Sequence, residues 1–278
     1  MTSIACCGGS EDTALLANLI GNEESIANTP CYVAYPKQQI SPSTCVVIGS
    51  DVFGYKLINT RAIADKFASE GHLAVIPDLF GGTEPPSNLM VSIDNLFNNK
   101  CSVFAKIYAF SRFMWYLPLF FYRNRRTTGA ITIDRVIAEL RAKRGIKKVA
   151  FQGYCWGGAI AVILAKNPNS GIDVACSADP GVIKLPEDVQ QIVKPIYFVL
   201  AGEDITIKEH HRKIIEETLS GKDKSLSDGF FYKVDWFKGA THGFAVRGKE
   251  SDPVVSNMRQ EAFQNALSFF TTVFNKLS

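Results

Sequence analysis

The motif GYCWGG at positions 153–158 is the stretch of this chain whose residue types could most readily carry out chemistry. It contains the pattern G-x-C-x-G, with Cys155 in the middle. A β-rich run at 148–152 precedes it and small residues suited to a closely packed helix follow, so the cysteine is expected where a strand passes directly into a helix. Glycines two positions to either side remove side chains that would collide in such a sharp turn. The pattern therefore predicts a nucleophilic Cys155 on a strained bend.

The expected helix also favours a reactive thiol. Its N-terminus carries a partial positive charge, which stabilises the thiolate, and the thiolate is the nucleophilic form of cysteine. The motif alone leaves a second interpretation open, because most isolated cysteines are small core residues and this one could mark a purely structural turn.

Two further residues stand where partners of such a nucleophile are expected. Asp204 follows the predicted strand 195–201, and His242 follows the predicted strand 230–237 in a glycine-rich loop. The order nucleophile, acid, histidine, each just after a strand, matches a Cys-His-Asp triad. Glu203 is the competing acid, and Asp204 alone could be a helix cap. Of the other histidines, His72 opens a buried-looking strand, and the neighbouring pair at 210–211 begins a polar helix.

The chemistry assigns a role to each group. His242 would accept the thiol proton or pair with the thiolate, and would later protonate the leaving group. Asp204 would fix the imidazole ring and stabilise its charged form. The backbone N–H groups of Trp156 and Val52 are the expected oxyanion donors, one from the nucleophile turn and one from the loop after the strand 44–49.

The elements that would position these residues alternate along the chain. Short apolar runs predict strands, longer amphipathic patterns predict helices between them, and βαβ units of this kind build a mostly parallel sheet with helices on both faces. Strands are expected at 31–35, 44–49, 72–76, 148–152, 173–177, 195–201 and 230–237, and helices at 57–69, 131–143, 159–166, 209–219 and 254–277. A single domain over 1–278 is predicted, with 1–28 as a peripheral N-terminal segment.

The composition is that of an ordinary globular protein, with 46% hydrophobic residues and a formal charge of +3. Such a small net charge and the lack of a basic run argue against nucleic acid as a partner. The seven cysteines have no CxxC spacing, so no zinc or redox motif is predicted. Free thiols and the lack of a signal-like N-terminus favour the cytoplasm. Cys6 and Cys7 are read as spare thiols in a tail, with palmitoylation as the less favoured alternative.

The segment 101–126 breaks the pattern. Nine aromatic residues lie between Phe104 and Tyr122, interrupted by Lys106, Arg112 and Pro118. The two cations argue against a membrane span, because each costs roughly 2.5–3.5 kcal/mol on insertion scales. Three interpretations remain: a helix packed over the sheet, a cap that walls the active site, and, least favoured, a helix over 101–122 at a membrane interface.

Taken together, the motifs resemble the dienelactone hydrolase family of the α/β-hydrolase superfamily, and its eukaryotic members more than the bacterial carboxymethylenebutenolidases. The resemblance runs over nearly the whole chain through CYVAYP, VVIGSDVFGY, LAVIPDLFGG, GYCWGG, AGEDI and ATHGFAVRG, in that order. It implies an α/β-hydrolase fold, a triad of Cys155, Asp204 and His242, and hydrolysis of lactones or activated esters without metal or cofactor.

The sequence departs from the bacterial pattern at two places. The acidic residue of the loop 50–54 is glutamate in the bacterial members, where it resembles a proton switch for the cysteine, and here it is Asp51, one methylene shorter. The arginine that binds the substrate carboxylate in those members is matched by Val246, with Arg247 beside it. Asp51, Phe53 and Arg247 are therefore candidate switch or substrate-binding residues, and dienelactone itself is disfavoured as the substrate.

The sequence favours an enzyme that hydrolyses small lactones, esters or thioesters through an acyl-cysteine, acting as a monomer or homodimer. The competing hypothesis is a non-catalytic, redox-sensing protein that uses Cys155 on a hydrolase scaffold. Retention of both His242 and Asp204 argues against the sensor, which needs a reactive thiol but no oxyanion site. A papain-like protease is excluded, because the cysteine lies in mid-chain and no suitable asparagine follows His242.

Overall fold

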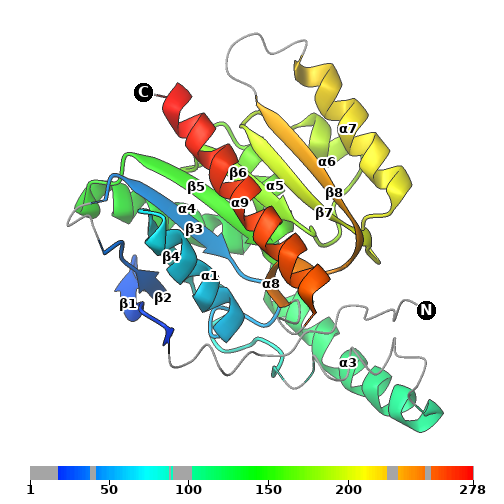
Figure 1. Cartoon of the computed structure of the whole chain (residues 1–278). Coiled ribbons are helices and arrows are strands. Elements are labelled where there is room, and N and C mark those ends of the chain that lie inside the picture. Colours follow the sequence, from blue (N-terminus) through cyan, green and yellow to red (C-terminus); the bar gives the residue numbers. More distant parts are fainter. Residues whose placement is uncertain are drawn as a thin grey trace.

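An eight-stranded sheet in the order β1-β2-β4-β3-β5-β6-β7-β8 forms the centre of the molecule (Figure 1). The computed structural model describes residues 18–37, 42–87, 89, 102–223, 231–247 and 252–277. The strands are β1 (Asn22–Ile26), β2 (Thr29–Ala34), β3 (Thr44–Gly49), β4 (Leu73–Pro77), β5 (Lys148–Tyr154), β6 (Val174–Ala178), β7 (Ile196–Glu203) and β8 (Tyr232–Thr241). Only β1 and β2 run antiparallel to their neighbours, so six strands form a continuous parallel sheet.

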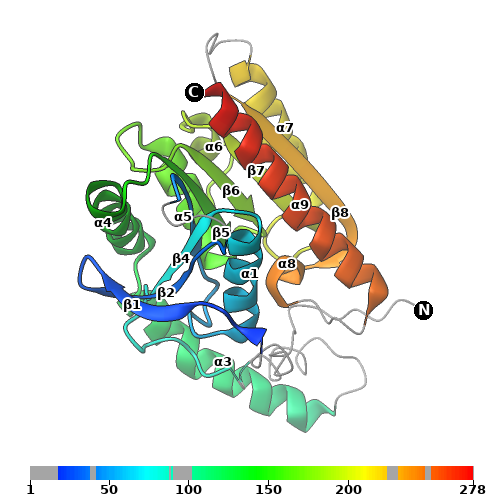
Figure 2. The same ribbon diagram turned by 60° about the vertical axis from the view of Figure 1, so that its left-hand side comes forward.

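Helices cover both faces of the sheet (Figure 2). One face is covered by α1 (Ile58–Ser69) and α9 (Pro253–Lys276), and the other chiefly by α4 (Arg126–Arg144), α5 (Trp156–Lys166) and α7 (Glu209–Asp223). Short helices α6 (Glu187–Gln190) and α8 (Phe244–Arg247) complete these layers, and α3 (Val103–Arg123) lies apart. The expected α/β arrangement is confirmed.

The central strands are apolar along their whole length because both faces are covered. Side chains of alternate parity enter two separate cores, as the two-residue period of a strand requires. In β3, Val46 and Ile48 face α1 and α9, whereas Cys45 and Val47 face α4 and α5. All four are completely buried. The two cores fix the register of the sheet and therefore the position of every loop at its carboxyl edge.

The sequence-based boundaries are close to those observed for most elements. The strand 44–49 and the start of α7 match, while β8 continues to Thr241, beyond the expected end at 237. The edge strand β1 was not anticipated, because its sequence NEESI is mostly polar and lacks the apolar run that marks the inner strands. It forms a hairpin with β2 through a turn in which Ala27 and Asn28 have positive φ.

The aromatic segment forms a 21-residue helix, but its packing differs from the first of the three expectations. The helix does not lie over the sheet: it projects from the molecule beyond the carboxyl ends of the strands (Figure 1). Only Phe120 near its end is buried among the large side chains described for it, against Phe80 and Trp156. The interpretation as a helix packed over the sheet is therefore wrong, because other helices already cover both faces of the sheet.

Across the described part of the chain, no helix meets the length and hydropathy needed to cross a membrane. Cys31, Cys45, Cys155 and Cys176 are free thiols. Cys6, Cys7 and Cys101 lie outside the described residues, as does most of the segment 1–28.

Gly153 lies very close to the backbone of Gly157 in the turn around Cys155. We therefore predict that Gly153→Ala severely destabilises the fold. A Cβ at Gly153 would lie 2.1 Å from the carbonyl oxygen of Gly157, a backbone atom that cannot move without breaking the turn. We expect a loss of about 3 kcal/mol or more in the free energy of unfolding, measured by urea denaturation.

The matched control is Gly221→Ala in α7, where an added Cβ meets no atom within 4 Å. That variant should be as stable as the wild type or about 0.5–1 kcal/mol more stable, since alanine is the better helix former. Equal stability of the Gly153 and Gly221 variants would contradict the assignment of the close contact.

Candidate active site

Cys155 occupies the bend between β5 and α5 in a backbone conformation that side chains rarely adopt. Its φ is +51° and its ψ is −104°. Cys155 N–H donates to the carbonyl of Ala178 (3.0 Å), and the Cys155 carbonyl accepts from Gly181 N–H (2.8 Å). The N–H of Gly157 donates to the Ser50 carbonyl at the end of β3 (3.1 Å). Hydrogen bonds to the neighbouring strands thus hold the bend in place, which offsets its backbone strain.

The three residues expected to act together form a chain of contacts in which His242 lies between Cys155 and Asp204. His242 Nε2 is 3.0 Å from Cys155 Sγ, and His242 Nδ1 is 2.8 Å from Asp204 Oδ2. The imidazole and the carboxylate are almost completely buried, whereas the cysteine is partly exposed. The geometry is that of a thiol, a base that can accept its proton, and an acid that orients the base.

Asp204 is itself fixed by a neighbour that the sequence did not single out. Its other oxygen, Oδ1, accepts from the N–H of Thr206 (2.6 Å) and lies 2.8 Å from the Thr206 hydroxyl. That hydroxyl also lies 3.1 Å from the Pro180 carbonyl. The two contacts leave Oδ2 directed at the imidazole.

Electrostatics favour an ionised pair at this site. Burial alone would lower the pKa of His242, but the facing Cys155 sulfur and the Asp204 carboxylate outweigh it and raise this pKa well above its usual value. Burial likewise opposes ionisation of Asp204, yet hydrogen bonding to His242, the charge of His242 and the Thr206 contacts lower the pKa of that carboxyl. The His242–Asp204 pair is therefore favoured in its charged form.

The two expected oxyanion donors lie in two different segments, the start of α5 and the loop after β3. Trp156 is the first residue of α5, and its N–H donates to no other described residue. In the loop after β3, Phe53 N–H donates to the Asp51 carboxylate and Gly54 N–H to the Asp51 carbonyl, whereas Val52 N–H has no acceptor among the described residues. Both candidate amides are thus uncommitted, as oxyanion donors must be.

Asp51 and Arg247, two further candidates, lie against each other. Arg247 Nε is 2.9 Å from Asp51 Oδ2, and both side chains are almost completely buried. The Arg247 guanidinium also faces the ring of Phe53 at 5.3 Å. Burial raises the pKa of Asp51, and the charge of Arg247 opposes this shift. The three residues therefore form one buried cluster, in which the cation neutralises the carboxylate.

Comparison with known proteins identifies the family of this chain. A model of the dienelactone hydrolase family matches residues 29–274. The chain belongs to the dienelactone hydrolase family. The carboxymethylenebutenolidase homolog of Mus musculus is 27% identical over 256 residues, which is 90% of either chain. The hydrolase pyvD of Aspergillus violaceofuscus is 26% identical over 280 residues, covering 99% of this chain and 100% of its own.

Solved structures show the same fold. The crystal structure of a dienelactone hydrolase-class protein from Klebsiella pneumoniae has a TM-score of 0.66 at 18% identity, covering 91% of this chain and 98% of its own. The resemblance to this family and the α/β-hydrolase fold expected from the motifs are both confirmed. This dienelactone hydrolase family member is a hydrolase that acts on ester or lactone bonds.

A second buried carboxylate near His242 was not anticipated. Asp179 follows β6, has a φ of +43°, and accepts hydrogen bonds from Ala201 N–H and Gly243 N–H (both 2.9 Å). Burial raises its pKa to about 7, with the charge of His242 opposing the shift and that of Asp204 adding to it. Asp179 thus fixes the start of the loop that carries Asp204 and the residue after His242. The sequence signal was weak, because a lone Asp-Pro pair is typical of turns.

Arg126, the first residue of α4, is a cation beside the nucleophile turn that was also missed. Its guanidinium donates to the Val182 carbonyl. A Cβ built on Gly181 would lie 3.3 Å from Arg126 Nη2 and 3.5 Å from the Cys155 carbonyl oxygen. Burial lowers the pKa of Arg126, and the facing charge of Cys155 opposes this effect. Arg126 lies far from Cys155 in the sequence, so no local motif indicated this contact.

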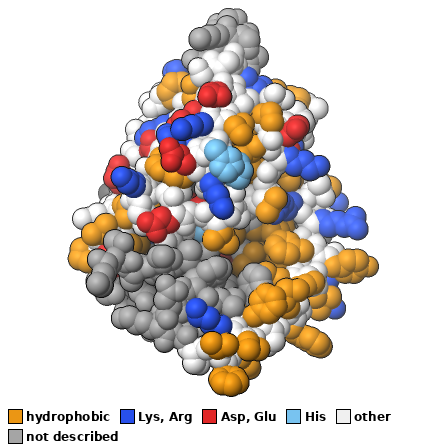
Figure 3. Space-filling model, turned by 90° about the vertical axis from the view of Figure 1, so that its right-hand side faces the viewer, with side chains coloured by type: hydrophobic (Ala, Val, Ile, Leu, Met, Phe, Trp, Pro, Cys, Tyr) orange, Lys and Arg blue, Asp and Glu red, His pale blue; other side chains and the backbone are white. Residues whose placement is uncertain are grey.

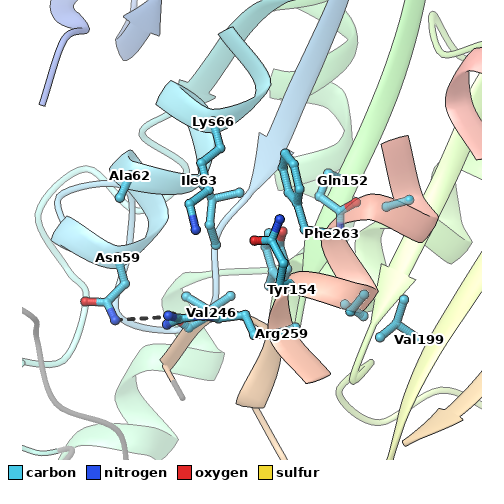
Figure 4. Close-up of a pocket in the computed structure, with 15 residues that line it drawn as sticks. Asn59, Ala62, Ile63, Lys66, Gln152, Tyr154, Val199, Val246, Arg259 and Phe263 are labelled. Carbon is cyan, nitrogen blue, oxygen red and sulfur yellow. Dashed lines mark hydrogen bonds between the residues drawn. The ribbon is translucent and has the colours of Figure 1, made fainter. Parts of the chain in front are cut away.

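A cavity of about 60 Å³ lies behind the nucleophile turn, between the sheet and helices α1, α8 and α9 (Figure 4). Gln152, Tyr154, Ile63 and Phe263 contribute to its walls, and the triad side chains do not. Its volume suits a few water molecules rather than an ester substrate. Across the described residues, no group of three or more His, Cys, Asp or Glu side chains could hold a metal ion.

The ionised pair predicts that His242 accelerates alkylation of Cys155. Iodoacetamide should label Cys155 about tenfold or more faster at pH 6 in the wild type than in His242→Ala, because the imidazolium stabilises the thiolate. Labelling is followed by mass spectrometry of the tryptic peptide 149–166, which contains Cys155 and no other cysteine. Thr206→Val, which only loosens Asp204, should slow the reaction less. Equal rates in the wild type and the His242 variant would contradict the activation.

The raised pKa of Asp179 predicts how stability depends on pH. A carboxyl whose pKa is higher in the folded than in the unfolded state contributes stability that is fully present below about pH 4 and is lost as the pH rises through about 7. Urea denaturation between pH 4 and 7.5 should therefore show a steeper loss of stability for the wild type than for Asp179→Asn. Parallel curves would mean that Asp179 is ionised throughout this range.

Proposed function

We propose that this protein hydrolyses small lactones, esters or thioesters through an acyl-cysteine intermediate, with Cys155 as nucleophile, His242 as base and acid, and Asp204 as the group that orients His242. The observation that carries the proposal is the chain of contacts from Cys155 Sγ to His242 Nε2 (3.0 Å) and from His242 Nδ1 to Asp204 Oδ2 (2.8 Å). Membership of the dienelactone hydrolase family supports the choice of ester and lactone bonds.

The first half of the reaction acylates the cysteine. The thiolate of Cys155, whose proton resides on His242 Nε2, attacks the carbonyl carbon of the substrate. A C–S bond forms and the carbonyl π electrons move onto oxygen. The N–H groups of Trp156 and Val52 stabilise the resulting oxyanion, and the charge at the N-terminus of α5 adds to this. Collapse of the intermediate breaks the ester C–O bond, and the leaving oxygen takes the proton from His242.

The second half regenerates the thiol. Neutral His242 removes a proton from a water molecule, the hydroxide attacks the acyl carbon, and a second oxyanion forms at the same place. Its collapse breaks the C–S bond and releases the carboxylic acid with a free thiolate, which His242 now faces as imidazolium. For a lactone, the leaving oxygen remains attached to the acyl group, so one hydroxy acid is the product.

The cluster of Asp51, Phe53 and Arg247 acts in this proposal as a support rather than a substrate anchor. Both charged side chains are almost fully buried and lie 2.9 Å apart, so Arg247 already neutralises a carboxylate. Asp51 holds the Phe53 amide and thereby shapes the loop that presents the Val52 N–H. Arg126, beside the nucleophile turn, is better placed to favour an anionic substrate.

We further propose that the enzyme works in the cytoplasm without a metal or cofactor. The reaction needs a reduced thiol, and each of the four described cysteines is free. Every step above is carried out by side chains and backbone amides of this chain, so no further group is required. Whether the working form is a monomer or a homodimer stays a prediction.

The proposal is tested by Cys155→Ala and Cys155→Ser on a panel of lactones, thioesters and 4-nitrophenyl acetate. Each variant should lose roughly 10³-fold or more in kcat/KM, since both remove the thiolate. Cys31→Ala, which alters a buried cysteine in β2, should retain full activity. Brief reaction of the wild type with 4-nitrophenyl acetate should place an acetyl group on the peptide 149–166.

Full activity in the Cys155 variants would overturn the assignment of the nucleophile. An absence of turnover by the wild type across the panel, combined with ready oxidation of Cys155 by peroxide, would instead favour the redox-sensing alternative.

A further inference from the structure

Helix α3 turns an unusually apolar surface toward solvent. Nearly every large side chain described on it is exposed, some by more than 70%. Figure 3 shows hydrophobic side chains gathered at the lower end of the molecule, the end at which Figure 1 places α3. The exposed residues are Val103, Phe104, Ile107, Tyr108, Phe110, Met114, Trp115, Tyr116, Leu119, Phe121 and Tyr122. Contiguous apolar surface of this kind marks an interaction site.

These side chains have a regular arrangement. At about 100° of rotation per residue, the exposed apolar residues other than Tyr116 fall within one band that covers roughly half of the helix circumference. Ser111 and Pro118 are the other residues in that band. Phe120, which anchors the helix to the protein, points away from it. The apolar face of α3 is therefore the one directed outward, the reverse of a helix that packs on its own core.

Cations line both edges of this band. Arg112 and Arg123 fall on one edge and Lys106 on the other at the same rotation per residue. The chain has no acidic residue between Asp94 and Asp134. Two further arginines at 125–126 follow the end of the helix, so every charged residue of α3 and of the segment that follows it to 126 is basic.

This combination is typical of a helix that lies in the interface of a membrane. Such helices bury an apolar face rich in Trp, Phe and Leu at the boundary between headgroups and acyl chains, while flanking Lys and Arg contact anionic headgroups. Trp115, Tyr108 and Tyr122 are of the types that prefer this boundary. We propose that α3 docks onto an anionic lipid surface, lying in its plane with the outward band immersed.

The charge favours lipid over the main alternative, a second copy of this chain. Two antiparallel α3 helices in contact would bring Lys106, Arg112 and Arg123 of one copy toward the same cations of the other, with no acidic residue on α3 to offset them. An anionic bilayer complements every charge on the helix. The helix is too polar at its edges to span a bilayer, which agrees with a position in the interface.

Docking of α3 would also affect the candidate active site, because Phe120 joins the helix to the residue that follows Cys155. Phe120 contacts Phe80 and Trp156, with ring centroids 4.9 and 6.3 Å away, and Trp156 is the residue after Cys155. A docked α3 would therefore hold the nucleophile turn near the membrane surface, where apolar esters concentrate. This last step rests on the proposed function, whereas the docking itself does not.

The test measures binding and not catalysis. The full-length protein is sedimented with vesicles of phosphatidylcholine alone and of phosphatidylcholine with phosphatidylserine. We expect binding to the anionic vesicles that weakens in high salt. Phe104→Glu and Trp115→Glu should each lower the partition coefficient about tenfold or more, since they place a charge in the apolar band. Val193→Glu, an exposed apolar residue at the opposite edge of the sheet, is the matched control and should bind as the wild type does.

A second measurement follows Trp115 itself. Its fluorescence should shift to shorter wavelength when anionic vesicles are added. Trp115→Phe should bind equally well but lose most of the shift, since Trp156 is already buried and Trp236, in β8, packs against the core away from α3. Circular dichroism and thermal unfolding establish that each variant is folded.

Three results would overturn the proposal. The first is no sedimentation of the wild type with either type of vesicle. The second is an equal effect of the Val193 and Phe104 variants. The third is a wild-type dimer in solution that Phe104→Glu dissociates, since that result would assign the apolar band to a second copy of the chain.

Discussion

The structure depends on one constraint, the positive φ of Cys155 at the junction of β5 and α5. A residue with a side chain adopts this conformation only where its surroundings impose it. Here they do so from three sides: β6 accepts the Cys155 N–H, the end of β3 accepts the Gly157 N–H, and the loop after β6 donates through Gly181. The contacts come from strands on both sides of β5, so the bend requires β3, β5 and β6 to be paired. The conformation of Cys155 is thus a product of the tertiary fold.

The same edge of the sheet collects an unusual number of buried charges. Asp51, Asp179 and Asp204 are all buried, and the cations that balance them are Arg247 and the imidazole of His242. Asp179 is the carboxylate with the weakest compensation, since its two hydrogen bonds come from neutral amides and its pKa is raised to about 7. When Asp179 is protonated, the His242–Asp204 pair has one negative charge fewer beside it. Of these three carboxylates, Asp204 is the one that faces a ring nitrogen of His242, and this contact distinguishes its proposed role from those of the other two.

Much of the fold and the contacts of the site could be predicted from the sequence, because they depend on local signals. The apolar runs at 44–49 and 148–152 can only be buried strands, and the glycines around Cys155 have little purpose outside a tight turn. Order along the chain then singled out Asp204 and His242. The contacts that escaped prediction join residues distant in sequence: Arg126 reaches the turn from α4, and Asp179 reaches Gly243 across β7. No periodicity encodes such contacts, since they arise only when several loops meet at one edge.

For the aromatic segment 101–126, the sequence predicted an unusual element but not how it packs. Its composition identified it as anomalous, but composition does not say which way an apolar face points. A buried helix and an interfacial helix can share the same periodicity, and the difference lies in whether the rest of the fold supplies a partner surface. In this protein the sheet is already covered by α1, α9, α4, α5 and α7, so no apolar face remains to receive α3. Of the side chains described on α3, only Phe120 belongs to a core. The described part of the fold therefore leaves the outward aromatic band without a partner, and the proposed lipid surface supplies one.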